Sequence, residues 1–482
     1  MNITNQILID GTFLNAANGN TASIINPVDE STITEIALGG ETEVNAAVAA
    51  AKTALVSEVW ANMSGWDRGK CLNRLADLME RDAETLARLE ALEIGRPYAE
   101  PLNVDMPSAV ATLRTYAGYA DKIEGRQIPS PDHFGRSITA IVERRPIGVA
   151  AIILPWNAPT MIACWKLGPA LASGCTVVVK PAMEAPLAVL HLGKLILEAG
   201  IPAGVVNIVP GHGSVIGDFM VTHKDISKVS FTGSPKVGAR IATLCAPLFK
   251  KVTLELGGKS PQIICEDADL DTAIPGVAMN IFANQGEICA AGSRIFVHRS
   301  MEEEVIKRMT AEAESRTLGS QFDEATSMGA LVSKAQFESV LRYINTGVSE
   351  GARIVAGGER HGDTGYFVKP TVLAGVRNDM IIAKEEIFGP VASLIAYDTL
   401  EEAIVLANDT DYALAANIWT RDFSTAHQLA HAIDAGTVWV NGGGTPDPRT
   451  AWGGKQQSGI GKELGWAGIE SYTKEHVLNF LY

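Results

Sequence analysis

Short apolar runs alternate with helix-like segments from residue 147 onward, and this alternation constrains the fold more than any other feature of the chain. The apolar runs are GVAAIIL, CTVVVK, GVVNIV, ISKVSF and KVTLEL. Apolar residues have helical spacing in two of the intervening segments, the one between CTVVVK and GVVNIV and the one between ISKVSF and KVTLEL. Nearly continuous apolar strands separated by helices are typical of a parallel sheet that is covered on both faces. Ligands of such sheets bind beyond the carboxyl ends of the strands, so residues at those ends are the first candidates for a site.

A second alternating region begins near residue 290, with strands predicted at RIFVHRS, VASLIAYD, AANIWT and GTVWVNG and helices between them. We therefore predict an α/β fold with two Rossmann-like domains. Residues 42–95 carry apolar residues at helical spacing and are predicted to pack on the first sheet. The segment 126–148 interrupts the first alternation and ends in Arg-Arg-Pro, which predicts a protruding hairpin used for assembly.

Composition narrows the class of protein. The 482 residues exceed the size at which a single core stops growing, so two or three domains are expected. A net charge of −15 without a basic patch argues against nucleic acid or an anionic membrane as a partner. The six cysteines form no CxxC pair, no apolar run is long enough for a membrane span, and no basic-then-apolar leader is evident, so we expect a cytoplasmic protein.

Three loops that follow predicted strands carry side chains suited to binding or catalysis. Asn157 lies in LPWNAP, where its amide suits a developing oxyanion and equally an ordinary turn. Lys180 ends the next strand, where its cation suits a phosphate or ribose, although exposed lysines are common. Gly233 and Ser234 lie in the strand-to-helix turn SFTGSPKVG, whose N–H groups suit a pyrophosphate although the GxGxxG pattern is absent.

Two carboxylates also lie at turns. Glu255 lies in the apolar run KVTLEL just before Gly257-Gly258, where desolvation would raise its pKa toward that of a useful base. Glu386 lies on the turn EEIFGP, and each of the two glutamates is equally compatible with a structural, hydrogen-bonded role. His427 and His431 have the spacing of two metal ligands, but with no third ligand and no HExxH motif we predict no metal site.

Cys289 stands among small and polar residues in ANQGEICAAGSR, a composition that predicts a loop entering a helix. A single cysteine is usually buried and unreactive, so this segment by itself leaves both an inert and a catalytic role open.

These motifs, in this order, resemble those of the aldehyde dehydrogenase superfamily over nearly the whole chain. Glu255 and Cys289 are also 34 positions apart (289 − 255), the separation that the family pattern has. The matching motifs are PWN at 155–157, KPA at 180–182, FTGS at 231–234, ELGGKSP at 255–261, QGEICAAGSR at 285–294, EEIFGP at 385–390 and SGIGKELG at 458–465.

The resemblance implies a specific chemistry. Cys289, as a thiolate, attacks an aldehyde, and the oxyanion of the thiohemiacetal is held by the Asn157 side chain and the Cys289 N–H. After hydride transfer to NAD(P), Glu255 deprotonates the water that hydrolyses the thioester to a carboxylic acid. Glu463 belongs to the supporting shell of the site. We expect the helix start after Cys289 to lower the pKa of its thiol.

The resemblance also implies a cofactor site. It places Lys180 near the adenosine ribose, Gly233 and Ser234 at the pyrophosphate, Trp156 near the same cleft, and Glu386 and Phe388 at the nicotinamide ribose and ring. Met183 stands where many NAD-preferring relatives carry a glutamate, so NAD is favoured only slightly and NADP remains an alternative.

Small residues replace aromatic ones at two places that line the substrate tunnel in many relatives, Ala158 and Ala283. With Trp165 and Trp452 nearby in the pattern, we predict a bulky or aromatic aldehyde as the substrate. A CoA-acylating semialdehyde dehydrogenase is the rival within the superfamily, although Glu255 argues against it. A non-catalytic cofactor-binding protein with the same fold is the alternative from another class.

The same comparison predicts the domain limits. The cofactor-binding domain comprises residues 1–122 and 147–254, the catalytic domain residues 255–450, and an oligomerisation arm residues 123–146 and 468–482. Such an arm extends the sheet of a neighbour, so a homodimer or homotetramer is expected.

Overall fold

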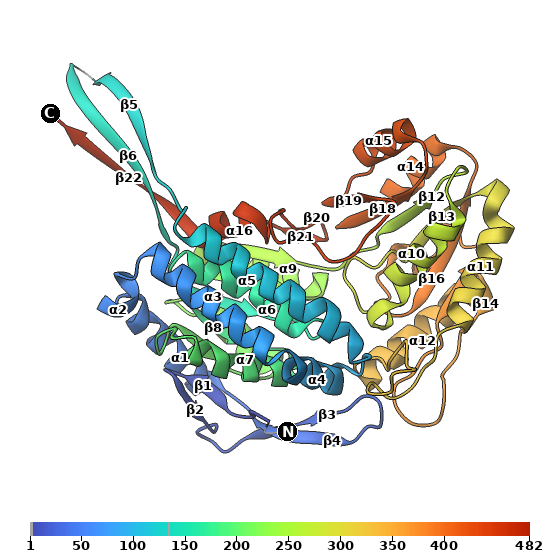
Figure 1. Ribbon diagram of the computed structural model, residues 1–482, viewed down its shortest axis with the longest axis horizontal. Coiled ribbons are helices and arrows are strands. Elements are labelled where there is room, and N and C mark those ends of the chain that lie inside the picture. The colour runs from blue at the N-terminus through green and yellow to red at the C-terminus, as the bar shows by residue number, and fades with distance from the viewer. Residues whose placement is uncertain (1–2, 134) are drawn as a thin grey trace.

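Two large α/β units and a projecting three-stranded arm make up the computed structural model (Figure 1), which describes residues 3–133 and 135–482. Residues 1, 2 and 134 lie outside the described residues; the first two belong to the predicted cofactor-binding domain and the third to the predicted arm. Within the described residues, no helix combines the length and the apolar character that crossing a membrane requires.

The first sheet has eight strands, and its five central ones are parallel in the order β9-β8-β7-β10-β11. Its strands are β2 (Thr12–Leu14), β1 (Ile7–Ile9), β9 (Val206–Ile208), β8 (Thr176–Lys180), β7 (Val149–Ile153), β10 (Lys228–Thr232), β11 (Lys251–Glu255) and β21 (Gly459–Ile460). The predicted apolar runs form the five parallel strands, and the short antiparallel strands β2, β1 and β21 close the two edges.

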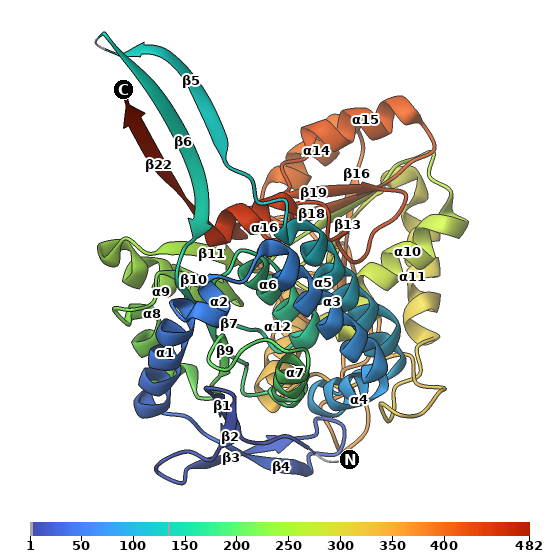
Figure 2. The ribbon, with the colours of Figure 1, turned by 60° about the vertical axis from the view of Figure 1, so that its left-hand side comes forward.

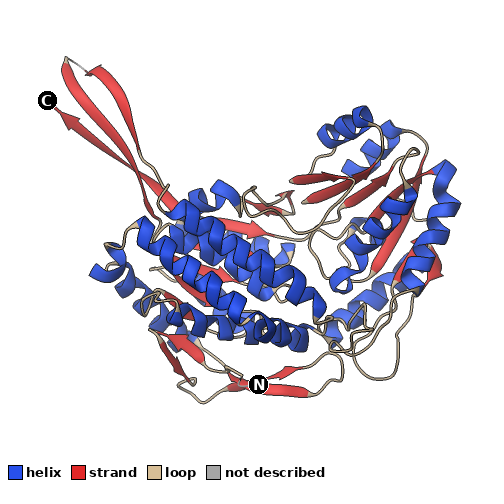
Figure 3. Ribbon diagram, viewed as in Figure 1, coloured by secondary structure: helices blue, strands red, loops and turns tan. Residues whose placement is uncertain are grey.

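Helices cover both faces of this sheet, as the helix and strand colours of Figure 3 show. Ala150 and Ile152 of β7 pack toward one helical layer, whereas Val149, Ala151 and Ile153 pack toward the other. The first layer contains α3 (Gly65–Arg81), α4 (Ala83–Ile94), α5 (Met106–Ala120), α6 (Pro159–Ala172) and α7 (Leu187–Glu198), and the second contains α1 (Glu41–Leu55), α8 (Asp218–Thr222) and α9 (Pro235–Cys245). Burial of alternate residues on both sides explains why the strands are continuously apolar.

The second sheet has seven strands in the order β14-β15-β16-β13-β12-β18-β19, and all pairs except β14 with β15 are parallel. Its strands are β12 (Pro261–Ile264), β13 (Arg294–His298), β14 (Arg353–Ala356), β15 (Thr371–Ala374), β16 (Val391–Tyr397), β18 (Ala415–Trp419) and β19 (Thr437–Val440). Helices α10 (Leu270–Phe282) and α11 (Glu302–Glu314) cover one face, and α12 (Lys334–Ser349), α14 (Leu400–Asn408) and α15 (Phe423–Ala432) cover the other.

The arm consists of β5 (Arg126–His133), β6 (Arg136–Pro146) and β22 (Thr473–Leu481), with β6 in the middle and both pairings antiparallel. Helix α16 (Gly465–Tyr472) precedes β22 and contacts α6. Figures 1 and 2 both show the arm clear of the two α/β units, with the C-terminus on it. The outer strands β5 and β22 therefore present free edges.

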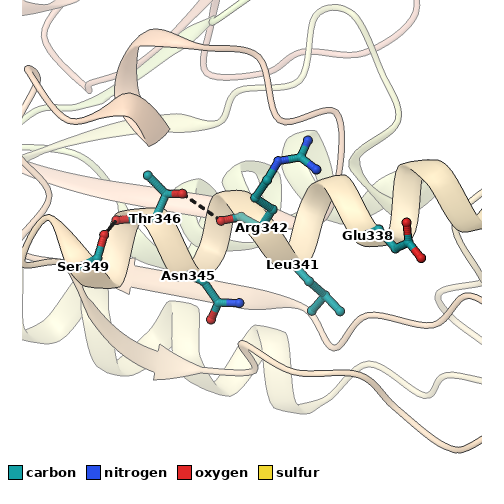
Figure 4. Close-up of a pocket in the computed structure, with 6 residues that line it drawn as sticks. All are labelled: Glu338, Leu341, Arg342, Asn345, Thr346 and Ser349. Atoms are coloured by element: carbon teal, nitrogen blue, oxygen red, sulfur yellow. Dashed lines mark hydrogen bonds between the residues drawn. The ribbon is translucent and has the colours of Figure 1, made fainter.

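Two hollows in the surface contain none of the predicted site residues. One of about 520 Å³ lies along a single face of α12 (Figure 4), where the Thr346 and Ser349 hydroxyls donate to backbone carbonyls of their own helix. The other, of about 570 Å³, lies at the base of the arm beside Arg68 and Lys474. Both are separate from the carboxyl ends of the parallel strands.

Candidate active site

The carboxyl ends of three neighbouring strands bring the candidate residues of the first sheet together. The strand order reverses between β7 and β10, which is the point where open α/β sheets bind ligands. Asn157 follows β7, Gly233 follows β10, and Glu255 is the last residue of β11. The Gly233 N–H donates to the Glu255 carbonyl at 3.0 Å, so the second and third of these loops are joined directly.

Asn157 reaches from the first unit to the loop that carries Cys289. Its side chain is buried, and its Nδ2 donates to the backbone carbonyl of Glu287 at 2.8 Å. Glu287 is two residues from Cys289, so this bond fixes the amide beside the thiol. An amide nitrogen has two hydrogens, and the second remains for an incoming oxygen.

The helix predicted after Cys289 is absent, and that prediction is wrong. Helix α10 and a 3₁₀ turn (Ala283–Gly286) come before the cysteine, which lies in a turn that leads into strand β13. Burial, together with the nearby carboxylates of Glu255 and Glu386, raises the pKa of the Cys289 thiol to about 12. The expected lowering of its pKa by a helix that starts after it is therefore also wrong, because a turn and strand β13 follow the cysteine and two acids lie near its thiol. The half-buried thiol requires a base to become a thiolate.

Glu255 is placed to be that base. Its side chain is buried, and among residues 3–133 and 135–482 neither carboxylate oxygen has a hydrogen-bond partner. Burial raises its pKa well above the ordinary value, and the nearby Glu463 adds to this, whereas Lys166 and Lys462 oppose it. A free, desolvated carboxylate next to a thiol can accept a proton from the thiol or from water.

Lys166 is the functional candidate that sequence reasoning missed. It lies in α6, is fully buried, and forms an ion pair with Glu463, while Ser230 of β10 donates to the same carboxylate oxygen at 3.1 Å. The sequence does contain a signal for this residue, because Lys166 is a single lysine inside the apolar segment MIACWKLGPALA. A cation buried in such a helix needs a buried partner of opposite charge. Glu463, predicted to support the site, is thus paired with Lys166. The two charges have opposite effects on Glu255, because Glu463 raises its pKa and Lys166 lowers it.

The outer part of the crevice holds the candidates for cofactor binding. Lys180 ends β8, is buried, and its ammonium donates only to the Pro181 carbonyl within the described residues, at 3.0 Å. Burial lowers its pKa to about 8. Ser234 is exposed at the start of α9 and its hydroxyl does not cap that helix, so the first-turn N–H groups stay available for an anion. This cation and this helix start fit a dinucleotide.

Glu386 and Phe388 approach from the second unit. The Gly258 N–H donates to Glu386 Oε1 at 3.0 Å, and burial raises the pKa of Glu386 to about 7. Phe388 has a left-handed backbone (φ +55°) and packs edge-on against Trp156 with ring centroids 5.2 Å apart. A Cβ at Gly257 would lie 2.0 Å from Glu386 Oε2, which explains the Gly at this position.

Three tryptophans pack on one another in the apolar cluster of the first unit. The rings of Trp165 and Trp452 have centroids 6.3 Å apart, and those of Trp452 and Trp439 are 5.9 Å apart. Cys289 packs against the same apolar cluster as these rings. The Trp165 indole N–H is buried and finds no hydrogen-bond acceptor in the part of the chain that the structure describes. This part of the cluster is therefore aromatic.

Comparison with known proteins agrees with this geometry. The model of the aldehyde dehydrogenase family matches residues 13–478. The chain belongs to the aldehyde dehydrogenase family. Mitochondrial aldehyde dehydrogenase of Homo sapiens is 44% identical over 472 residues, which cover 98% of this chain and 90% of the human protein. The predicted family and the prediction of an aldehyde-oxidising enzyme are confirmed.

Solved structures of aldehyde dehydrogenases extend the likeness to the fold. The NAD⁺ complex of an aldehyde dehydrogenase from Bacillus cereus is 45% identical, with a TM-score of 0.96 and coverage of 98% of this chain and 96% of that one. P. syringae AldA, an indole-3-acetaldehyde dehydrogenase solved with NAD⁺ and IAA, is 40% identical, with a TM-score of 0.97 and coverage of 100% and 97%. The predicted α/β fold with two Rossmann-like domains is confirmed.

Proposed function

We propose that this aldehyde dehydrogenase oxidises an aldehyde to the carboxylic acid through covalent catalysis by Cys289, with NAD as the hydride acceptor. The observation that carries the proposal is the free Glu255 carboxylate beside the Cys289 thiol, with the Asn157 amide bound to the same loop. These three groups are a base, a nucleophile and an oxyanion donor within one crevice.

Acylation begins with transfer of the thiol proton from Cys289 to Glu255. The sulfur then attacks the aldehyde carbon, and the carbonyl oxygen becomes the oxyanion of a thiohemiacetal. The second N–H of the Asn157 amide and the Cys289 backbone N–H stabilise this charge. Once Glu255 has taken this proton, its carboxylate is neutral and no longer opposes a negative charge on the sulfur.

The residues present fit a nicotinamide cofactor. Lys180 would hold the adenosine ribose, the Gly233–Ser234 turn the pyrophosphate, and Glu386 with Phe388 the nicotinamide ribose and ring, with Trp156 beside Phe388. Bound NAD would supply the hydride acceptor that the oxidation step needs. Complexes of relatives with NAD⁺ support NAD, while Met183 in place of a carboxylate leaves NADP as an alternative.

Deacylation uses Glu255 as the base for water. After Glu255 has released the thiol proton to solvent, its carboxylate takes a proton from a water molecule and the hydroxide adds to the thioester carbon. The carbon–sulfur bond then breaks, which releases the carboxylic acid and leaves Cys289 as a thiolate. Glu463 and Lys166 form a buried ion pair near Glu255, and the two charges shift the pKa of Glu255 in opposite directions. Glu463 therefore acts through Glu255 as a positioning and tuning residue.

The substrate that we propose is a bulky or aromatic aldehyde. The edge-to-face pair Trp165–Trp452 supplies an aromatic wall, and Ala158 and Ala283 add no side-chain bulk beyond a methyl group. The indole-containing ligand bound by P. syringae AldA supports this class. Aromatic rings favour tilted contacts with aryl groups, so an aryl aldehyde gains contacts that acetaldehyde does not.

The deciding experiment measures reduction of NAD and NADP by the purified protein with benzaldehyde, an aliphatic aldehyde and a charged one. Wild type should form reduced cofactor and free acid, whereas Cys289→Ala should form neither, with Cys245→Ala as a matched cysteine control. The same assay with CoA tests the CoA-acylating rival, for which the product would be an acyl-CoA. Absence of turnover across the panel would overturn the proposal.

The remaining parts of the proposal concern architecture and assembly. We propose the division into residues 1–122 with 147–254, residues 255–450, and the arm of residues 123–146 with 468–482, supported by the separation of the eight-stranded, seven-stranded and three-stranded sheets. The free edges of β5 and β22 support a homodimer or homotetramer, in which the arm adds strands to a second copy. Six free cysteines support a cytoplasmic location.

A further inference from the structure

We propose that Arg96 is a positioning residue that aims the Asn157 amide from within the same α/β unit, at the boundary with the second unit. This inference rests on the proposed function, because it assumes that Asn157 stabilises the oxyanion. Within the described residues, the hydrogen bonds and ion pairs of Arg96 go to Asn157 and Asp105 and not to Cys289 or Glu255, so its link to the oxyanion site is the backbone of Asn157.

Arg96 is placed by the end of helix α4. Gly95 ends that helix with a left-handed backbone (φ +86°), and its carbonyl accepts from the Ala330 N–H of the second unit at 3.2 Å. The chain then turns inward, so that the Arg96 side chain is only 3% exposed. A guanidinium in this position must have its charge and donors matched.

The guanidinium bridges two groups. Its Nη2 lies 2.8 Å from Asp105 Oδ1, which compensates the buried charge. Its Nη1 donates to the backbone carbonyl of Asn157 at 3.3 Å. Asp105 belongs to a π-helical turn, η1 (Pro101–Asp105), directly before α5, so the pair also ties α5 to the β7–α6 loop. The planar fork of an arginine can serve both partners at once, which a lysine ammonium cannot do with the same geometry.

The Asn157 carbonyl has a second donor from the cysteine loop. Asn284 Nδ2 donates to that carbonyl at 3.0 Å and to the Glu287 carbonyl at 3.2 Å. The Asn157 amide in turn donates to the same Glu287 carbonyl at 2.8 Å. These hydrogen bonds form a closed ring of Asn157, Asn284 and Glu287. Arg96 is bound to this ring through its hydrogen bond to the Asn157 carbonyl.

The cysteine loop has a strained backbone that depends on such support. Asn284 and Gln285 have φ values of +46° and +53°, in the left-handed region that non-glycine residues seldom adopt. Glu100, four residues after Arg96, accepts the Asn284 N–H at 3.0 Å. The segment after α4 therefore fixes both sides of the oxyanion site, with Arg96 on the Asn157 side and Glu100 on the cysteine side.

The test is a comparison of Arg96→Met, Arg96→Lys and the control Arg68→Met, measured as the first-turnover rate of cofactor reduction per titrated Cys289. Arg68 is the control because it is likewise an arginine that ties loops together through backbone carbonyls, here those of Ala172 and Met63, but it lies in the hollow at the base of the arm. We expect Arg96→Met to lower this rate about 10- to 100-fold, because small misplacements of a catalytic group have effects of this size. Arg96→Lys should fall between wild type and Arg96→Met, and Arg68→Met should match wild type.

A cycle with Asn157→Ala separates positioning from general destabilisation. If Arg96 acts through Asn157, Arg96→Met should cause no further loss in the Asn157→Ala background, whereas equal losses in both backgrounds would overturn the inference. Arg96→Met by itself leaves the buried Asp105 carboxylate without its partner cation. The double variant Arg96→Met with Asp105→Asn removes that charge, and it should show the same loss of rate with a restored melting temperature. A first-turnover rate of Arg96→Met equal to wild type would also overturn it.

The two levels of the proposal fail in different ways. If wild type turns over no aldehyde, or if Asn157→Ala retains the wild-type rate, the proposed function is at fault. If wild type is active and Asn157→Ala is slow while Arg96→Met is normal, only the role of Arg96 is refuted.

Discussion

Gly258 offers a direct test of how tightly the packing around Cys289 controls the reaction. A Cβ at this position would lie 2.4 Å from the Cys289 carbonyl oxygen, a backbone atom that cannot rotate away. Ordinary contact begins at 3.4 Å, so Gly258→Ala requires a displacement of about 1.0 Å (3.4 − 2.4). The displaced group is the nucleophile's own peptide or the peptide that holds Glu386. A 1 Å misplacement in an active site costs about 100-fold in rate, or about 2.7 kcal/mol of activation free energy.

The assay is the steady-state rate of cofactor reduction per active site, with active sites counted by alkylation of Cys289. Gly118→Ala in α5 is the control, because a Cβ there meets no heavy atom within 4 Å. We expect Gly258→Ala to lose about 100-fold in kcat, and Gly118→Ala to match wild type with an equal or higher melting temperature. A kcat for Gly258→Ala within about threefold of wild type would refute the reasoning, since the loop would then absorb the methyl group without consequence.

Three further predictions concern the base, the cofactor and the substrate. Glu463→Gln removes a charge that raises the pKa of Glu255 and should move the half-maximum of thioester hydrolysis to lower pH, whereas Lys166→Met removes an opposing cation and should move it to higher pH; stopped-flow pH profiles that shift in one direction for both variants would contradict this. Met183→Glu should raise the preference for NAD over NADP about tenfold in kcat/KM, since a carboxylate there would repel a 2′-phosphate, and an unchanged ratio would count against the assigned ribose site. Trp165→Ala should lower kcat/KM for benzaldehyde about tenfold with little change for acetaldehyde, and equal losses for both substrates would remove the argument for an aromatic wall.

Features that depend on neighbours along the chain were predictable. Continuous apolar strands followed by helices identify a parallel sheet, and such a sheet has its binding edge at the strand ends. Lys180 and Glu255 lie there because each is the last residue of its strand. The motifs around Cys289 and Glu386 were recognisable for the same reason, since each is a short run of residues whose order is retained.

The surroundings of Cys289 were not predictable in this way. Small polar residues suit both a helix start and a turn, and only the packing of α10 against the second sheet places the helix before the cysteine. The carboxylates that raise the pKa of its thiol come from β11 and from the turn after α13 (Ile381–Lys384), far away in sequence. Desolvation and Coulomb interaction depend on distance in space, which local composition does not contain.

The sequence by itself determined the α/β class, the strand ends that carry the candidate groups, and the family. Only the tertiary structure decided which of these groups are paired. The buried ion pair of Lys166 with Glu463 joins residues 297 positions apart, and the bond from Arg96 to Asn157 spans 61. Strand periodicity is a local property that neighbouring residues encode, whereas the partner of a buried charge is set by how distant segments pack, because burial makes an unpaired charge too costly to keep.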